Sequence, residues 1–300
     1  MATIRAPEVV PSPPEDCEKL IKAFEGLGTD EKAIIRVLGQ RNASQRKKIK
    51  ETFQQIYNKS LIDCLDSELS GDFGKIFLDS NGLFCESVIE NKWTMTKLST
   101  IFIQYFYTRH INCSLILVRG LLNSHVSSHK FLDFMLLVSS YRYDKEAVDS
   151  SIANTEAVIL HDAIRTKNLD DDDLVWILSI RNIFQLRATF QCYKDNYGKS
   201  IDEDIRACGK GILESILKVV VWCIDSPERH FAEVVRASIV GLGTDEDSLT
   251  RAIVTRAEID MMKVRGEFFN ANKSSLDNAV IGDTSGHYKD FLMTLLGAKI

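Results

Sequence analysis

Apolar residues recur along this chain with the spacing of helices that bury one face. Within residues 33–38, and again within 249–253, the apolar side chains stand at positions i, i+3 and i+4. That spacing places them on one side of a helix with 3.6 residues per turn. Alternating runs typical of strands are scarce, and the chain has only five prolines. The pattern predicts an all-α protein.

The two clearest helices each follow the same loop. Residues 26–31 and 241–246 both read Gly-Leu-Gly-Thr-Asp-Glu, 215 positions apart. Thr29 and Thr244 are predicted to cap the helices that follow, because a threonine hydroxyl accepts hydrogen bonds from first-turn N–H groups. The Asp-Glu pair after each threonine is predicted to lie in the first turn, where negative charge complements the helix dipole.

The loops belong to a longer internal repeat. Matches at offsets of 215, 140 and 68 residues divide the chain into four units of about 70 residues. With an N-terminal tail at 1–12, the predicted units are residues 13–80, 81–142, 154–225 and 229–300. The second unit is about ten residues short where its crossing and returning helices belong. A distorted or partly missing helix is expected there.

Two residue types bear on the packing of these units. One arginine recurs per unit near a helix end, at Arg41, Arg109, Arg181 and Arg256. A structural ion pair or a carbonyl cap is the expected role. The three tryptophans, Trp93, Trp176 and Trp222, are predicted to lie in the core.

An acidic residue follows each glycine loop at one fixed interval. Glu68 lies 40 residues beyond Gly28. Asp283 lies 40 residues beyond Gly243. Because antiparallel helices bring alternate loops to one face, each carboxylate is expected beside its loop. Loop carbonyls and a carboxylate make the all-oxygen site that hard cations, above all calcium, prefer.

Charge and hydropathy exclude several classes of protein. The formal net charge is −5, whereas nucleic-acid binding needs concentrated Lys and Arg. No apolar stretch approaches the roughly 20 residues of a membrane span, and residues 1–14 lack the apolar core of a signal peptide. Seven scattered cysteines without CxxC spacing indicate reduced thiols. We expect a cytoplasmic protein with no transmembrane segment that meets membranes from the surface.

The glycine loops, their acidic partners and the fourfold repeat resemble the annexin family, and most of all its plant branch. G-x-G-T followed about 40 residues later by Asp or Glu is the type II calcium motif of that family. The resemblance covers essentially the whole chain, including residues 139–143 and 255–260. It implies five helices per repeat, a slightly curved disc, and terminal repeats side by side. It also implies calcium-dependent attachment to anionic phospholipid when calcium rises.

The resemblance assigns the calcium ligands by position. In repeat one they are the carbonyls of Phe24, Gly26 and Gly28 and the carboxylate of Glu68. In repeat four they are the carbonyls of Ile239, Gly241 and Gly243 and the carboxylate of Asp283. These ligands fall short of the roughly six to eight oxygens that calcium takes, so water or a lipid phosphate would complete each shell.

The apex of each loop carries a leucine, Leu27 or Leu242. In a loop that must be exposed to reach lipid, an apolar side chain can enter the headgroup region. The alternative is an ordinary exposed leucine. We expect these two residues to contact the membrane.

The two middle repeats depart from the motif. Repeat three carries Thr166 and Asn168 in place of the glycines and Cys208 in place of the carboxylate. Repeat two also lacks both glycines, and residues 91–132 contain no acidic residue. Because calcium affinity depends on ligand charge and number, both are expected to be silent in calcium binding.

The sequence therefore predicts a calcium-dependent binder of anionic phospholipid rather than an enzyme. A second interpretation is a helical-repeat scaffold for protein partners such as actin, with the calcium sites secondary. Signals for enzymes are incomplete. Tyr193 stands where a P-loop needs its first glycine. Gln40 stands where plant annexins linked with peroxidase-like activity carry a histidine.

Overall fold

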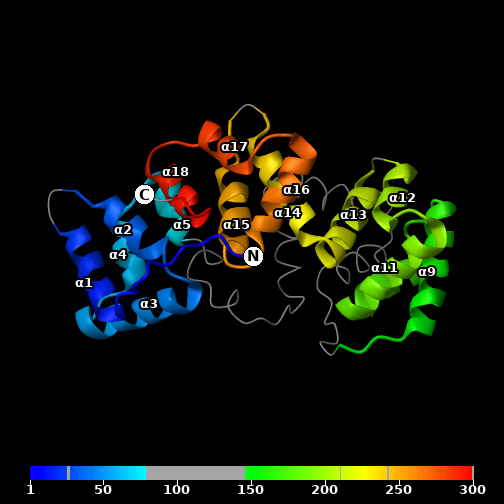
Figure 1. Cartoon of the computed structure of the whole chain (residues 1–300), viewed down its shortest axis with the longest axis horizontal. Helices are drawn as coiled ribbons and strands as arrows, with labels where there is room; N and C mark the ends of the chain where they lie inside the picture. Colours follow the sequence, from blue (N-terminus) through cyan, green and yellow to red (C-terminus); the bar gives the residue numbers. More distant parts are fainter. Residues whose placement is uncertain (26–27, 79–145, 210, 242, 299–300) are drawn as a thin grey trace, which may run out of the picture. The chain divides into compact units, whose positions relative to one another are not determined.

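Helices are the only elements assigned in the part of the chain that the structure describes. This computed structural model describes residues 1–25, 28–78, 146–209, 211–241 and 243–298. The all-α prediction is confirmed for these ranges (Figure 1). The predicted second repeat, with Trp93 and Arg109, lies outside the described residues.

The described helices come in three groups of five. The first group is α1 (Pro13–Phe24), α2 (Glu31–Leu38), α3 (Ala43–Tyr57), α4 (Leu61–Glu68) and α5 (Gly71–Leu78). The second is α9 (Ser150–Arg165), α10 (Asp172–Ile180), α11 (Ile183–Tyr197), α12 (Ile201–Cys208) and α13 (Ile212–Asp225). The third is α14 (Pro227–Ile239), α15 (Glu246–Arg256), α16 (Met261–Asn272), α17 (Leu276–Asp283) and α18 (Gly286–Leu295). Five helices per repeat is what the annexin resemblance implies.

The chain divides into two compact units. One contains residues 1–91 and 231–300, and the other contains residues 92–230. The boundary falls within α14. Repeat one and almost all of repeat four therefore belong to the first unit, and repeat three belongs to the second. None of the described helices is long and apolar enough to cross a bilayer.

The core of the first unit joins helices from opposite ends of the chain. Helix α18 packs against α2 and α5, and α15 packs against α5 and α18. The ring centroids of Phe77 and Phe291 lie 5.3 Å apart, and those of Phe73 and Phe291 lie 6.0 Å apart. Such edge-to-face pairs stabilise aromatic cores. The expectation that the terminal repeats lie side by side is confirmed.

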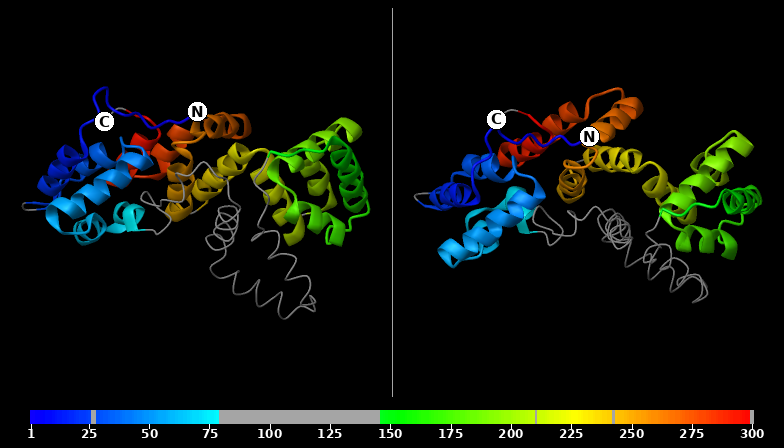
Figure 2. Two further views of the ribbon diagram at one scale, coloured as in Figure 1. Left: turned by 90° about the horizontal axis from the view of Figure 1, so that it is seen from below. Right: turned by 60° about the horizontal axis from the view of Figure 1, so that its bottom comes forward.

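The N-terminal residues pack onto repeat four before the chain enters α1. The Thr3 N–H donates to the carbonyl of Ala257 at 2.7 Å, and the Thr3 hydroxyl donates to that of Leu295 at 2.7 Å. Both views in Figure 2 show this blue segment beside the red α18. Repeats one and four are thus linked by the tail as well as by their helices.

The second unit has its own core, in which α9 packs against α11 and α12, and α12 against α13. Trp222 is buried and its indole N–H donates to Asp202 Oδ2 at 2.9 Å, as predicted for a core tryptophan. The prediction was wrong for Trp176, which is 46% exposed. Helix α10 is apolar on nearly every side, so its apolar pattern does not reveal which side faces out. The guanidinium of Arg181 covers the exposed ring at 4.7 Å.

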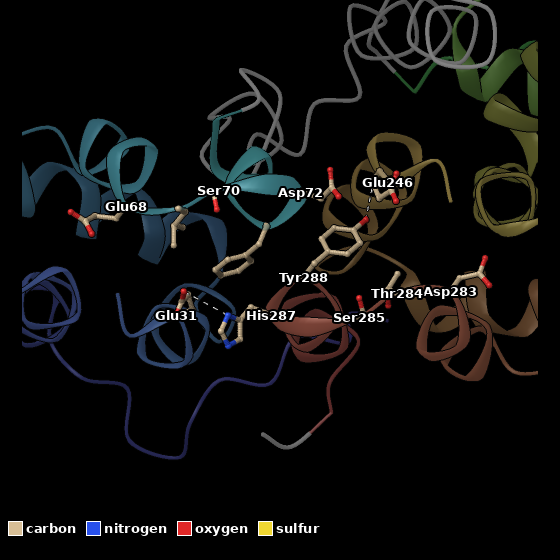
Figure 3. A pocket seen from close by; sticks show the side chains of 12 residues that line it. Glu31, Glu68, Ser70, Asp72, Glu246, Asp283, Thr284, Ser285, His287 and Tyr288 are labelled. Atoms are coloured by element: carbon tan, nitrogen blue, oxygen red, sulfur yellow. Dashed lines mark hydrogen bonds and ion pairs between the residues drawn. The ribbon is translucent and has the colours of Figure 1, made fainter. Parts of the chain in front are cut away.

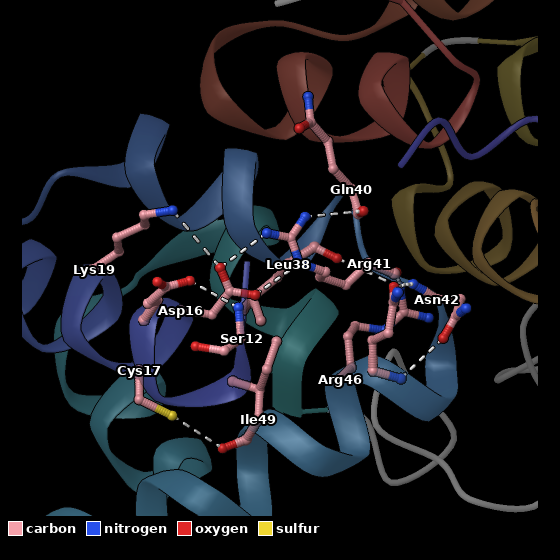
Figure 4. A network of polar contacts seen from close by, with 12 residues as sticks. Ser12, Asp16, Cys17, Lys19, Leu38, Gln40, Arg41, Asn42, Arg46 and Ile49 are labelled. Atoms are coloured by element: carbon pink, nitrogen blue, oxygen red, sulfur yellow. Dashed lines mark hydrogen bonds and ion pairs between the residues drawn. The ribbon is translucent and has the colours of Figure 1, made fainter. Parts of the chain in front are cut away.

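The three recurring arginines in the described part of the chain, Arg41, Arg181 and Arg256, form ion pairs, which is one of the two roles predicted. Arg41 Nε lies 2.7 Å from Asp16 Oδ2 and Arg41 Nη2 lies 2.8 Å from Asp16 Oδ1, with both side chains buried (Figure 4). Arg181 pairs with Glu156 in the second unit. The acid precedes its arginine by 25 residues in both repeats. The internal repeat therefore preserves a pair and not only a single residue.

Repeat four compensates the charge of its recurring arginine with different partners. The position equivalent to Asp16 is Phe231, and the Arg256 guanidinium lies 4.6 Å from the centre of that ring. The charge of Arg256 is instead matched by Asp260, one turn further along the chain. A cation over an aromatic face and a local carboxylate together replace the ion pair that repeats one and three form.

Candidate metal centre

The helix caps at the two glycine loops are aspartates rather than the predicted threonines. Asp30 Oδ1 accepts from the N–H of Ala33 at 3.0 Å, and Asp245 Oδ1 accepts from the N–H of Ser248 at 3.1 Å. A charged carboxylate is a stronger acceptor than a hydroxyl, and the aspartate stands one residue closer to these donors. The prediction of threonine caps was wrong, and both threonine hydroxyls bond elsewhere.

Each threonine ties its loop to the distant acidic residue. Thr29 Oγ1 lies 2.8 Å from Glu68 Oε2 and 3.3 Å from the Glu68 carbonyl oxygen. Thr244 Oγ1 donates to the Asp283 carbonyl at 2.9 Å. The structure therefore places both acidic residues beside their loops, as the 40-residue interval predicts.

The two loops close with the same backbone hydrogen bond. The Asp30 N–H donates to the Ala23 carbonyl at 2.9 Å, and the Asp245 N–H donates to the Ser238 carbonyl at 2.8 Å. Each bond lies within one repeat, and the residues that it joins are at equivalent positions in repeats one and four. The described ends of the two loops are thus joined in the same way.

Glycine is required in these loops by backbone conformation. Gly28 and Gly243 have φ values of +97° and +95°. A Cβ added at either residue would meet no atom within 4 Å. The restriction therefore comes from the positive φ, which side chains with a Cβ disfavour.

We predict that Gly28→Ala and Gly243→Ala each lower the free energy of unfolding by about 1–2 kcal/mol, measured by urea titration. The matched control is Gly266→Ala in α16, where the added Cβ also meets open space but φ is not positive. Alanine there should stabilise the helix by about 0.5–1 kcal/mol. If all three substitutions had the same sign and size, the conformational argument would be contradicted.

The predicted ligand residues lie where helices end. Glu68 is the last residue of α4 and Asp283 the last of α17, and both are exposed. Phe24 and Ile239 end α1 and α14, just before their loops. Gly26, Leu27 and Leu242 lie outside the described residues.

Both acidic residues also line one cavity of about 340 Å³ within the first unit. Its lining residues are all pairs related by the 215-residue offset. They include Glu31 with Glu246, Glu68 with Asp283, Ser70 with Ser285, and Asp72 with His287. Figure 3 shows Glu68 and Asp283 at opposite ends of this space. The cavity is thus a pseudo-twofold arrangement that no single repeat could form.

The cavity is strongly acidic, with five carboxylates and one histidine among its lining residues. His287 Nδ1 lies 3.8 Å from Glu31 Oε1. The Tyr288 hydroxyl donates to the Glu246 carbonyl at 3.0 Å, and burial raises the pKa of that phenol, so it stays a donor. A space lined by one sign of charge concentrates cations near both loops.

The donors at each loop fit a hard cation. Each loop has a positive-φ glycine and backbone carbonyls, and its threonine hydroxyl bonds to the backbone carbonyl of an exposed acidic residue and, in repeat one, also to the Glu68 carboxylate. Oxygen donors of this kind suit calcium rather than softer metals. In the ranges that the structure covers, no three His, Cys, Asp or Glu side chains gather as a side-chain metal site.

The corresponding loop of repeat three is occupied by internal hydrogen bonds. Ile164 stands where repeat one has Phe24, and its carbonyl accepts from the Lys167 N–H at 2.9 Å. The same carbonyl accepts from the Cys208 thiol, with Sγ 3.3 Å away. Burial raises the pKa of Cys208, so the thiol remains a donor. The carbonyl and the residue in the acidic position therefore bond to each other.

The acidic run at the start of α10 caps that helix and lies in its first turn. Asp171 Oδ1 accepts from the N–H groups of Asp173 and Leu174, at 3.0 and 3.3 Å. Asp172 and Asp173 lie in the first turn. Negative charge there complements the helix dipole.

Comparison with known proteins identifies the same architecture. The annexin family model matches residues 15–79, 155–220 and 230–295, which is more than half of the chain. Annexin D3 of Arabidopsis thaliana is 51% identical, with all of both chains covered. Sequence relatives of this kind share the whole length and not only the motif.

Solved structures agree with the sequence matches. The chain is similar to annexin III with a TM-score of 0.76 and 28% identity, covering 100% of this chain and 98% of that one. It is similar to a calcium-bound annexin (Sm)1 with a TM-score of 0.72 and 25% identity, covering 96% and 90% of the two chains.

Proposed function

The chain belongs to the annexin family, in its plant branch, and from that premise we propose that it binds anionic phospholipid membranes through calcium held by the loops of repeats one and four. Family membership supports calcium-dependent phospholipid binding in general. The assignment to two particular loops goes further and depends on the residues of this chain.

The observation that carries the proposal is the repeated tie between loop and acidic residue. Thr29 and Thr244 hold Glu68 and Asp283 beside loops whose second glycines have nearly equal positive φ values. Two loops 215 residues apart thus share the bond from threonine to the backbone carbonyl of the acidic residue, which supports a calcium site at each. A relative of this fold has been solved in a calcium-bound form, annexin (Sm)1.

The ligands in repeat one would be the carbonyls of Phe24, Gly26 and Gly28 with the Glu68 carboxylate. Those in repeat four would be the carbonyls of Ile239, Gly241 and Gly243 with the Asp283 carboxylate. The glycines would orient carbonyls toward one point, and the threonines would position the acidic residues. When bound, the ion supplies positive charge that can be shared with a lipid phosphate. Leu27 and Leu242 would then face the headgroup region.

The contacts in repeat three support two calcium sites rather than three. Its Ile164 carbonyl accepts from Lys167 and Cys208, and no carboxylate stands at position 208. The silence of repeat two stays a prediction from its sequence, since those residues lie outside the described ranges.

The test is calcium titration of the full chain with and without vesicles. Calorimetry should find two strong sites, and mixed phosphatidylserine–phosphatidylcholine vesicles should pellet the protein only with calcium. Cys208→Asp should leave the stoichiometry at two, because the Lys167 N–H still bonds to the Ile164 carbonyl. A clear third strong site would contradict the assignment. If the protein does not pellet with vesicles in calcium but cosediments with actin, the scaffold interpretation would be favoured.

A further inference from the structure

The two glycine loops share six residues but differ in the residue just before them. Repeat one has Glu25 at this position and repeat four has Val240, 215 residues later. Both residues are exposed, and Val240 has 63% of its surface in contact with solvent. A valine at the end of a helix gains nothing from such exposure, because its apolar surface is favourable only when removed from water.

The chain leaves a helix at this position in both repeats, although the last helical hydrogen bond reaches four residues back in repeat four and three in repeat one. The Val240 N–H donates to the Arg236 carbonyl at 3.1 Å, and the Glu25 N–H donates to the Lys22 carbonyl at 3.3 Å. Each residue directly follows the last residue of its helix and enters a loop closed by the same hydrogen bond, from Asp30 to Ala23 or from Asp245 to Ser238. The clearest difference between the loops at this position is the side chain, a carboxylate in repeat one and an apolar valine in repeat four.

The position is next to the proposed ion. Val240 stands between Ile239 and Gly241, whose carbonyls are the proposed ligands, and Glu25 stands between Phe24 and Gly26. A lipid phosphate on the ion would bring the bilayer against either side chain. The valine would gain by leaving water, whereas the carboxylate would be repelled by anionic headgroups.

We propose that Val240 inserts into the membrane and makes the loop of repeat four the principal anchor, while Glu25 keeps the loop of repeat one at the level of the headgroups. The proposal rests on the calcium-dependent lipid binding proposed above. It states which of the two loops enters the bilayer and which stays at its surface. Its ligand is the boundary between headgroups and acyl chains of an anionic bilayer.

Exchanging the two side chains tests the proposal, because each position directly follows a helix and enters a loop closed by the same hydrogen bond. Binding of the full chain to phosphatidylserine–phosphatidylcholine vesicles is measured at saturating calcium. Val240→Glu should weaken binding on the order of tenfold, and Glu25→Val should strengthen it about threefold. The double exchange should return close to the wild-type affinity. Calcium binding without vesicles should change by less than about twofold in each variant, since neither side chain is a proposed ligand.

Depth in the bilayer is measured with tryptophan at each position and lipids brominated in the acyl chain. Quenching over the background of the three native tryptophans should be greater for Val240→Trp than for Glu25→Trp. Equal quenching, or wild-type affinity for Val240→Glu, would overturn the proposal while leaving the calcium-dependent function intact. A wild-type protein that binds no vesicles with calcium would overturn both.

Discussion

Replacing Glu68 by glutamine and Asp283 by asparagine together should abolish calcium-dependent vesicle binding and leave the helix content unchanged. Each substitution removes the only side-chain charge proposed for its site, and calcium affinity depends on that charge. The amides keep the size of the side chains, and a glutamine oxygen at position 68 can still accept from Thr29. Both positions are exposed ends of helices, where substitutions change stability by about 0.5 kcal/mol or less.

The measurement is cosedimentation with phosphatidylserine-containing vesicles across a calcium titration, with circular dichroism on the same samples. Each single variant should keep one site and half of the calorimetric stoichiometry. A charge-matched control is Asp66→Asn with Asp195→Asn, two exposed acids on α4 and α11 that lie outside the loops. The control should bind like the wild type. Undiminished binding by the Glu68 and Asp283 double variant would exclude these residues as ligands.

Replacing Arg41 by alanine should lower the free energy of unfolding by about 3–5 kcal/mol. The side chains of Arg41 and Asp16 are only 3% and 1% exposed, and they share two hydrogen bonds of 2.7 and 2.8 Å. Removing the guanidinium leaves a buried carboxylate without its partner, and desolvation of that charge makes the loss large. Urea unfolding followed by circular dichroism measures it.

The chain supplies a matched control in an exposed arginine–aspartate pair. Arg165 and Asp162 lie 3.4 Å apart with side chains 64% and 60% exposed. Arg165→Ala should therefore cost less than about 1 kcal/mol. The apolar pair Asp16→Leu with Arg41→Met should recover most of the stability lost in Arg41→Ala, since no buried charge remains. Equal losses for Arg41→Ala and Arg165→Ala would contradict the role of burial.

The sequence by itself determined the helices, their grouping and the candidate loops. Helical periodicity is a local signal, and it is strong in 33–38 and 249–253 because one face of each helix is buried. The recurrence of the same loop after 215 residues and of an acid after a further 40 needs no knowledge of packing. Antiparallel helices alone make that interval sufficient to bring Glu68 and Asp283 back to their loops.

The tertiary structure decided which of two neighbouring residues caps a helix and which side of a helix faces outward. Threonine and aspartate are both good helix caps, so the order Thr-Asp does not tell which one caps. The choice fell to Asp30 because the hydroxyl of Thr29 meets Glu68, a residue 39 positions away. Similarly, the apolar pattern of α10 did not reveal that Trp176 faces outward, since nearly every side of that helix is apolar.

The partners of individual side chains also depended on the tertiary structure. Arg256 recurs in sequence like Arg41, yet its ring partner Phe231 and its carboxylate partner Asp260 follow from the packing of repeat four. The shared acidic cavity exists only because α2, α5, α15 and α18 meet in one unit. Periodicity and spacing indicate which face of each segment is buried. The group that the segment meets is set by tertiary contacts, some of them between helices more than 200 residues apart such as α2 and α18, and a single sequence carries no local signal of these contacts.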